Sequence, residues 1–60
     1  MTEEERARRV AELDVDIEQC NADLVRYERA NAPDKVATVV NQREALRRLR
    51  AELLAAEVGR

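Results

Sequence analysis

The sequence predicts an all-α protein, an antiparallel two-helix hairpin with coiled-coil-like packing that dimerises into a four-helix bundle. In the first half of the chain the larger apolar residues recur at alternating spacings of three and four, as on one face of a helix, and in the second half they do so with Gln42 at one of the positions. The only cluster of helix-breaking residues in the interior, at residues 31–34, separates the two halves. Besides Met1, only 16 of the 60 residues are apolar and larger than Ala, and so small a core favours oligomerisation.

The first helix is expected at about residues 3–30. Residues 2–5 (Thr-Glu-Glu-Glu) match a capping box, in which the Thr2 hydroxyl accepts a hydrogen bond from the Glu5 N–H and the Glu5 carboxylate reaches back. Three acidic residues also suit the positive end of a helix dipole, so we interpret them as a helix start and not as a metal-binding cluster. The stripe expected to face the second helix is Val10, Leu13, Ile17, Cys20, Leu24 and Tyr27.

The turn is expected at residues 31–32 and the second helix at about 33–58, which makes residues 1–60 a single hairpin domain. Asn31 can adopt the left-handed conformation that ends a helix, Pro33 suits the first turn of the next helix, and Gly59 supplies a stop. The apolar stripe of the second helix is Val36, Val39, Leu46, Leu49 and Leu53, with Gln42 and Ala56 at the same spacing.

The two stripes predict a register in which the numbers of facing residues add to about 63. This register places Gln42 opposite Asn21 as a polar layer in the core, and it sets Glu12 and Asp14 near Arg50 and Arg48. Exposed ion pairs contribute well under about 1 kcal/mol each, so their expected role is to select register and orientation. A polar core layer and an unpaired Cys are more typical of a natural hairpin than of a designed one.

A second, weaker apolar row predicts self-association. We expect it to form one face that packs against a second copy across a two-fold axis. The residues of this expected face are Ala11, Val15, Ala22, Val25, Val40, Ala51, Leu54 and Val58. Helix propensity on an exposed surface would explain the Ala residues of this row, but it explains the Val and Leu residues less well.

The side chains available for chemistry argue against an enzyme. The chain has no His and a single Cys, which excludes an internal disulfide and leaves little basis for a zinc site. No nucleophile and base pair, phosphate-binding loop or metal-ligand set is recognisable, so neither catalytic residues nor a cofactor are expected. Cys20 is interpreted as a small core hydrophobe, with a redox role as the alternative.

The charge balance disfavours a protein that mainly neutralises phosphates, because 11 basic residues face 13 acidic ones. No stretch is apolar enough to span a bilayer and no signal-peptide segment is recognisable, so a cytoplasmic location is expected. The expected function is that of a small dimeric regulator, adaptor or scaffold that binds another protein. Arg8, Arg26 and Arg48 are the least obviously neutralised cations and the candidate contacts for an acidic partner.

In length and expected architecture the chain is similar to the repressor-of-primer family of plasmid proteins, helical hairpins that dimerise into four-helix bundles and bind paired RNA hairpins. The resemblance covers the whole chain as a shape and rests on no shared motif, so it assigns no residue a role. It implies an alternative function, RNA binding by the surface of a four-helix bundle.

Overall fold

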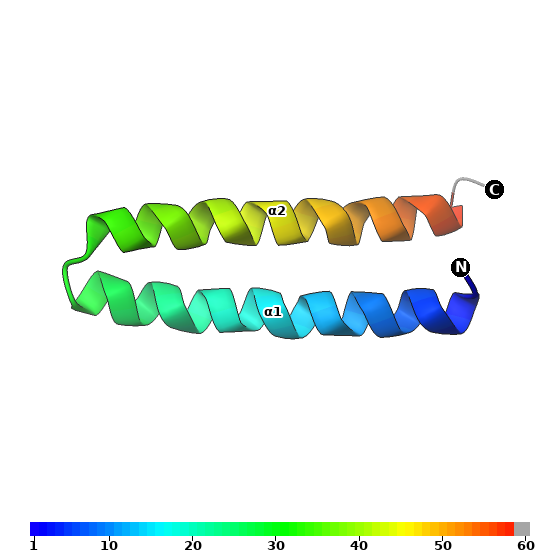
Figure 1. Ribbon diagram of the computed structural model, residues 1–60, viewed down its shortest axis with the longest axis horizontal. Coiled ribbons are helices and arrows are strands. Elements are labelled where there is room, and N and C mark those ends of the chain that lie inside the picture. Colours follow the sequence, from blue (N-terminus) through cyan, green and yellow to red (C-terminus); the bar gives the residue numbers. More distant parts are fainter. Residues whose placement is uncertain (59–60) are drawn as a thin grey trace.

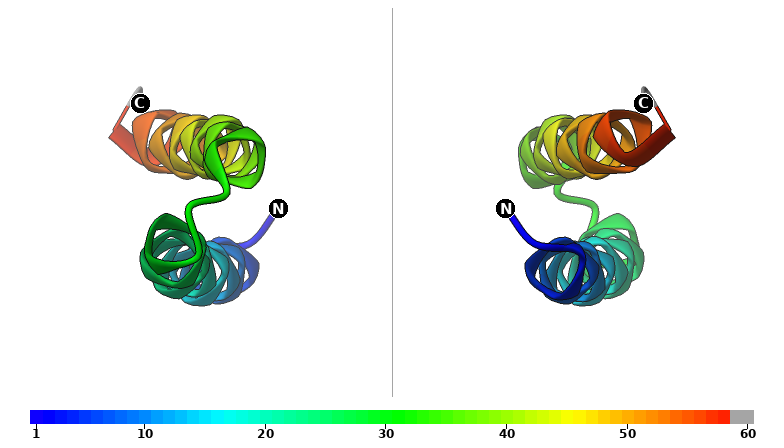
Figure 2. Two further views of the ribbon diagram at one scale, coloured as in Figure 1. Left: turned by 90° about the vertical axis from the view of Figure 1, so that its left-hand side faces the viewer. Right: turned by 90° about the vertical axis from the view of Figure 1, so that its right-hand side faces the viewer.

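The computed structural model describes the backbone of residues 1–58 and the side chains of residues 1–56. Two helices, α1 (Glu3–Arg29) and α2 (Pro33–Val58), lie side by side in antiparallel directions, with the turn at one end of the molecule (Figure 1). The predicted all-α helical hairpin is therefore confirmed. Its dimensions are 45 × 16 × 12 Å, and the views along its length show one layer formed by one pair of helices (Figure 2).

The predicted N-terminal cap of α1 is present. Thr2 has extended backbone angles, and its Oγ1 accepts a hydrogen bond from the Glu5 N–H at 3.1 Å. The Glu5 carboxylate reaches back and accepts from the Thr2 hydroxyl at 3.2 Å. The acidic side chains of the first turn therefore stabilise the helix start, as the sequence indicates.

We expect Thr2→Ala to lower the free energy of unfolding by about 1 kcal/mol, because it removes the acceptor for a free helical N–H. Urea unfolding followed by circular dichroism would measure the change. Thr38→Ala is the matched control, since the Thr38 hydroxyl donates only to the Asp34 carbonyl one turn earlier on an exposed surface. Equal losses from the two substitutions would contradict a capping role for Thr2.

The turn is a Schellman motif followed directly by the second helix. Asn31 has the predicted left-handed conformation, with φ of 53°. Its N–H donates to the Glu28 carbonyl at 3.2 Å, and the Ala32 N–H donates to the Tyr27 carbonyl at 3.0 Å. The Ala32 carbonyl then accepts the Val36 N–H at 3.0 Å, which starts α2 at Pro33. These bonds fix the antiparallel return of the chain.

The tightest packing lies in the half of the hairpin nearer the turn. Cys20, Leu24 and Val39 are buried, each 7% exposed, and no described side chain is fully enclosed. The partly buried residues packed against these three are Tyr27, Val36, Val40 and Leu46. Val10, Leu13, Ile17 and Leu53 are also partly buried. One hairpin alone therefore encloses very little apolar surface.

The register of α2 differs from the expected one. Asp14 pairs with Arg50, one of the two Arg residues expected near it, but Asn21 pairs with Arg43 and not with Gln42. The numbers of these paired residues add to 64, against an expected sum of about 63. Gln42 is exposed and Leu49 is 50% exposed, although both were expected in the inner stripe. The structure instead turns Val40, expected on the self-association face, toward the core. Arg43 and Arg50 take the inner positions because long Arg stems can line an apolar contact while their guanidinium groups reach polar partners.

Candidate interaction surface

One broad side of the hairpin carries a hollow that both helices line. We call the six residues that line it the lateral face: Asp14, Ile17, Arg47, Arg50, Ala51 and Leu54. Its floor is apolar, since Ile17 and Leu54 are partly buried and Ala51 adds a small exposed side chain. Val40 lies on the same side of α2, because it precedes Arg47 by seven residues, or about two helical turns. The lateral face is thus an apolar strip flanked by charges of both signs.

With the exception of Glu44, which lies between Val40 and Arg47 on α2, the charges beside this strip are sorted by helix. Asp14, Glu18 and Asn21 follow one another at spacings of four and three on α1, and so form a single acidic and polar stripe. Three Arg residues at the complementary positions of α2 form a basic stripe: Arg43, Arg47 and Arg50. Lengthwise, Asp14 is level with Arg50 and Asn21 with Arg43, and Glu18 is within one residue of the level of Arg47, given the observed register.

At two of these three heights, the side chain on α1 pairs with the Arg on α2 of the same hairpin. The Arg50 Nε donates to Asp14 Oδ1 at 2.6 Å, and the Arg43 Nη1 donates to Asn21 Oδ1 at 2.8 Å. Arg47 instead contacts Glu44 on its own helix at 3.5 Å. Among the described residues Glu18 takes part in no ion pair.

One of the hydrogen-bond donors of Arg43 has no acceptor. Its Nε is shielded from solvent and has no hydrogen-bond partner, although Nη1 reaches Asn21. A buried polar atom without a partner costs stability, more so on a charged group. Neither inner Arg residue was predicted from the apolar pattern. The signal that could have identified them is their spacing of seven from each other and from Val36, which continues one helical stripe.

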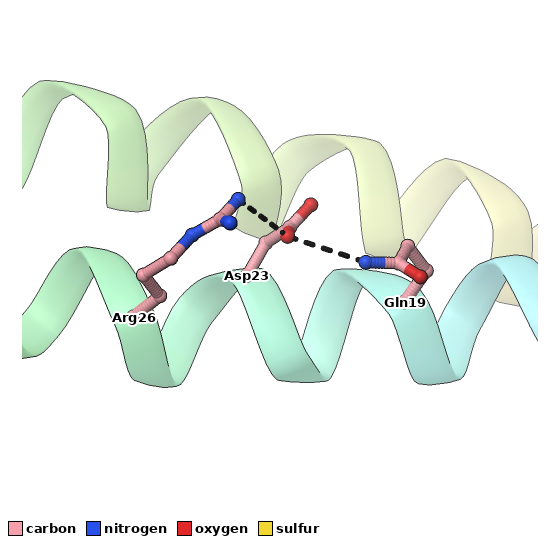
Figure 3. Close-up of polar contacts among 3 residues, drawn as sticks. All are labelled: Gln19, Asp23 and Arg26. Atoms are coloured by element: carbon pink, nitrogen blue, oxygen red, sulfur yellow. Dashed lines mark hydrogen bonds and ion pairs between the residues drawn. The ribbon is translucent and has the colours of Figure 1, made fainter.

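The side chains on the opposite side of α1 are polar and form hydrogen bonds within the same helix. Asp23 lies two residues beyond Asn21, about 160° around the helix from it. Asp23 Oδ1 accepts from Arg26 Nη2 at 3.0 Å and from Gln19 Nε2 at 3.4 Å (Figure 3). Arg26, expected to be free for an acidic partner, is therefore neutralised by its own helix. Arg8 and Arg48 are exposed and make no ion pair within the described residues.

The expected self-association face does not form one continuous surface. Val15 is 68% exposed and lines a shallow hollow of α1 with Asp14, Glu18 and Gln19. That hollow shares only Asp14 with the lateral face. The other exposed members on α1 are Ala11, Ala22 and Val25. Val40, Ala51 and Leu54 lie on the lateral side, and the Val58 side chain is outside the described residues.

An apolar groove lies at the open end of the hairpin, away from the turn. Its lining residues are Met1, Arg9, Leu13, Leu49, Glu52 and Leu53. Leu49 is exposed there because the shift in register moves it out of the contact between the helices. Arg9 and Glu52 line the same groove but form no ion pair within the described residues.

The only aromatic residue is held between two cations near the turn. The Arg26 guanidinium lies 5.3 Å from the centre of the Tyr27 ring, and the Lys35 Nζ lies 5.5 Å from it. Such contacts are favourable and cover the ring with charged groups. A separate hollow at the turn has as its lining Glu28, Asn31, Ala32, Pro33, Val36 and Ala37. Tyr27 thus closes the core near the turn and is not part of that hollow.

No protein-family model, curated protein or solved structure matches this chain.

The remaining chemistry of the described residues is limited. Cys20 is a free, buried thiol at the contact between the helices. Across the described range, no three His, Cys, Asp or Glu side chains gather closely enough to hold a metal ion. Over the same range, neither helix contains a segment both long and apolar enough to cross a membrane. The features that remain are surfaces, among them the lateral face, which both helices line.

Proposed function

We propose that this chain is a non-catalytic interaction module that dimerises through its lateral face into a four-helix bundle and acts as a regulator, adaptor or scaffold. The observation that carries the proposal is the apolar strip of the lateral face, in which Ile17 and Leu54 are partly exposed and Ala51 is exposed, built from both helices of a molecule that is one layer thick. Stable domains bury the apolar side of each layer against a second layer. A second hairpin supplies that layer.

The surface area of one hairpin supports this proposal. A compact monomer of 6.9 kDa has an accessible surface of about 4,000 Å² by the usual scaling with mass. This hairpin exposes 4771 Å². The excess is about 800 Å², which is the area that each partner contributes to an interface of standard size. The radius of gyration, 14.0 Å, also exceeds the value of about 10 Å expected for a compact chain of this length.

Once two lateral faces are joined, the exposed cations remain available to a further protein. Arg8 and Arg48 are the cations we assign to contacts with an acidic partner surface. RNA binding is less well supported, because the Tyr27 ring, the only aromatic platform, is covered by Arg26 and Lys35. An electrophoretic shift of RNA hairpins at about 50 mM salt that weakens on changing Arg8 and Arg48 to Glu would favour the RNA alternative.

The test of dimerisation is a charge placed at the centre of the strip. Ala51→Glu should weaken self-association by at least about a hundredfold, because a large charged side chain would replace a small one at the interface and would be desolvated twice, once in each copy. Ala51 is exposed in the single hairpin, so the substitution leaves the contact between α1 and α2 intact. Sedimentation equilibrium of the full chain measures the dissociation constant.

Ala45→Glu is the matched control. It places the same charge on an exposed Ala of the same helix, about 120° around from Ala51. We expect it to leave the dissociation constant within about threefold of the unmodified value. If both substitutions weaken the dimer equally, or if neither does, the lateral face is not the interface.

A further inference from the structure

We propose that the second copy docks on the lateral face with its turn at the same end as the turn of the first, across a two-fold axis parallel to the helices. This inference rests on the proposed self-association and adds the orientation of the partner. It derives from the way in which the two signs of charge are divided between α1 and α2.

Two closed arrangements bring a pair of lateral faces together. When the two-fold axis is parallel to the helices, α1 of one copy lies along α2 of the other and the two turns share an end. When the axis is perpendicular to the helices and runs from α1 toward α2, α1 lies along α1, α2 lies along α2, and the turns are at opposite ends. Both arrangements use the same patch on each copy, as a two-fold interface requires.

The parallel axis brings unlike charges together. Rotation about this axis leaves every residue at its own height, so the register within one hairpin also holds between copies. Glu18 is then within one residue of the level of Arg47 of the second copy, and Asp14 is level with Arg50 of the second copy. Asn21 becomes level with the second Arg43, whose Nε has no partner within its own hairpin.

The perpendicular axis brings like charges together. Asp16 is the midpoint of α1, and Asp14 and Glu18 lie two residues to either side of it. When the axis crosses α1 at this midpoint, Asp14 of one copy is level with Glu18 of the second copy. By the same register Arg47 is within one residue of the level of Arg50 of the second copy, and symmetry repeats each contact. Like charges at an interface select against the arrangement that creates them.

Glu18 and Arg47 are free to make the new contact. Glu18 has no ion pair in the described part of the hairpin, and the Arg47 contact with Glu44 is 3.5 Å long between side chains that are 50% and 57% exposed. Such a surface pair is weak and readily exchanged. The second copy is thus matched to the lateral face in charge as well as in the area it would cover.

The first arm of the test measures the dimer dissociation constant of charge-reversal variants. Glu18→Arg or Arg47→Glu alone should weaken the dimer by about tenfold, since every contact occurs twice. The double variant should return to within about threefold of the unmodified chain. Glu12→Arg and Arg48→Glu are the matched controls, because each lies two residues, or about 160°, away from Asp14 or Arg50 on the same helix.

The second arm measures the distance between the two turns. A nitroxide on Asp34→Cys, in a Cys20→Ala background with helicity checked by circular dichroism, reports this distance by pulsed electron resonance. With turns at one end, the labels should be separated by about 20 Å, the width of two helices. With turns at opposite ends, their separation should approach the 45 Å length of the hairpin.

The outcomes separate the two proposals. An unmodified chain that stays monomeric overturns the proposed function itself. A dimer with distant labels, in which Glu18→Arg tightens binding by relieving repulsion from Asp14, retains the function and overturns the orientation. Charge reversals that change nothing also overturn the orientation, whereas weakening by the single changes, recovery by the double change and a short distance support it.

Discussion

Leu24→Ala should remove most of the stability of the hairpin. Leu24 is one of three buried core residues, and truncating a buried Leu costs about 2–5 kcal/mol in lost burial and in the cavity left behind. A chain of this length has a total stability of roughly 3–9 kcal/mol. In a two-fold dimer both copies lose the same side chain. Urea unfolding followed by circular dichroism, at one fixed chain concentration, would measure the loss.

Val15→Ala is the control for this loss. Val15 is on the same helix but is 68% exposed, so its truncation should change stability by less than about 0.5 kcal/mol. If Leu24→Ala is no more destabilising than Val15→Ala, the core does not lie where the structure places it.

Replacing both members of the Asn21–Arg43 pair by Leu should stabilise the protein by about 2 kcal/mol. The pair is partly buried and the Arg43 Nε has no partner, so its desolvation is incompletely compensated. Apolar side chains of similar volume often stabilise a protein when they replace a buried polar or charged pair. Asn21→Leu alone should instead destabilise it by about 2 kcal/mol, because the guanidinium group would lose its acceptor.

The contrast between the single and the double variant is the informative result. Urea unfolding of Asn21→Leu, Arg43→Leu and the double variant would complete the double-mutant cycle and give the coupling between the two positions. Asn41→Leu measures the gain from helix propensity alone, since Asn41 is exposed on α2. If the effects of the two single substitutions added up to the effect of the double substitution, the polar pair would contribute nothing beyond its separate residues.

The sequence was sufficient to predict the hairpin, because its signals are local. Thr2 as a cap, Asn31 in the left-handed conformation and Pro33 at the start of α2 each act within a few residues of the chain. The stripe of α1 was also predictable, since its members are apolar without interruption and α1 is the more amphipathic of the two helices.

The rotation of α2 could not be predicted from its apolar pattern. The large apolar residues of α2 are spread around much of the helix. Either the stripe through Leu49 or the stripe through Val40 could therefore have packed against α1. The choice depends on Arg43 and Arg50, which find acceptors only when Asn21 and Asp14 lie at the matching height on the other helix. The rotation of α2 is therefore set by contacts between residues far apart in the sequence, which the local apolar periodicity does not reveal.

The central claim is that one hairpin is incomplete and that a second lies face to face on it. Small-angle X-ray scattering from the full chain over a hundredfold range of concentration tests this claim most directly. We predict a particle of twice the 6.9 kDa chain mass whose maximum dimension stays near the 45 Å length of one hairpin. A helical particle of 6.9 kDa with a radius of gyration of 14.0 Å at every concentration would contradict it.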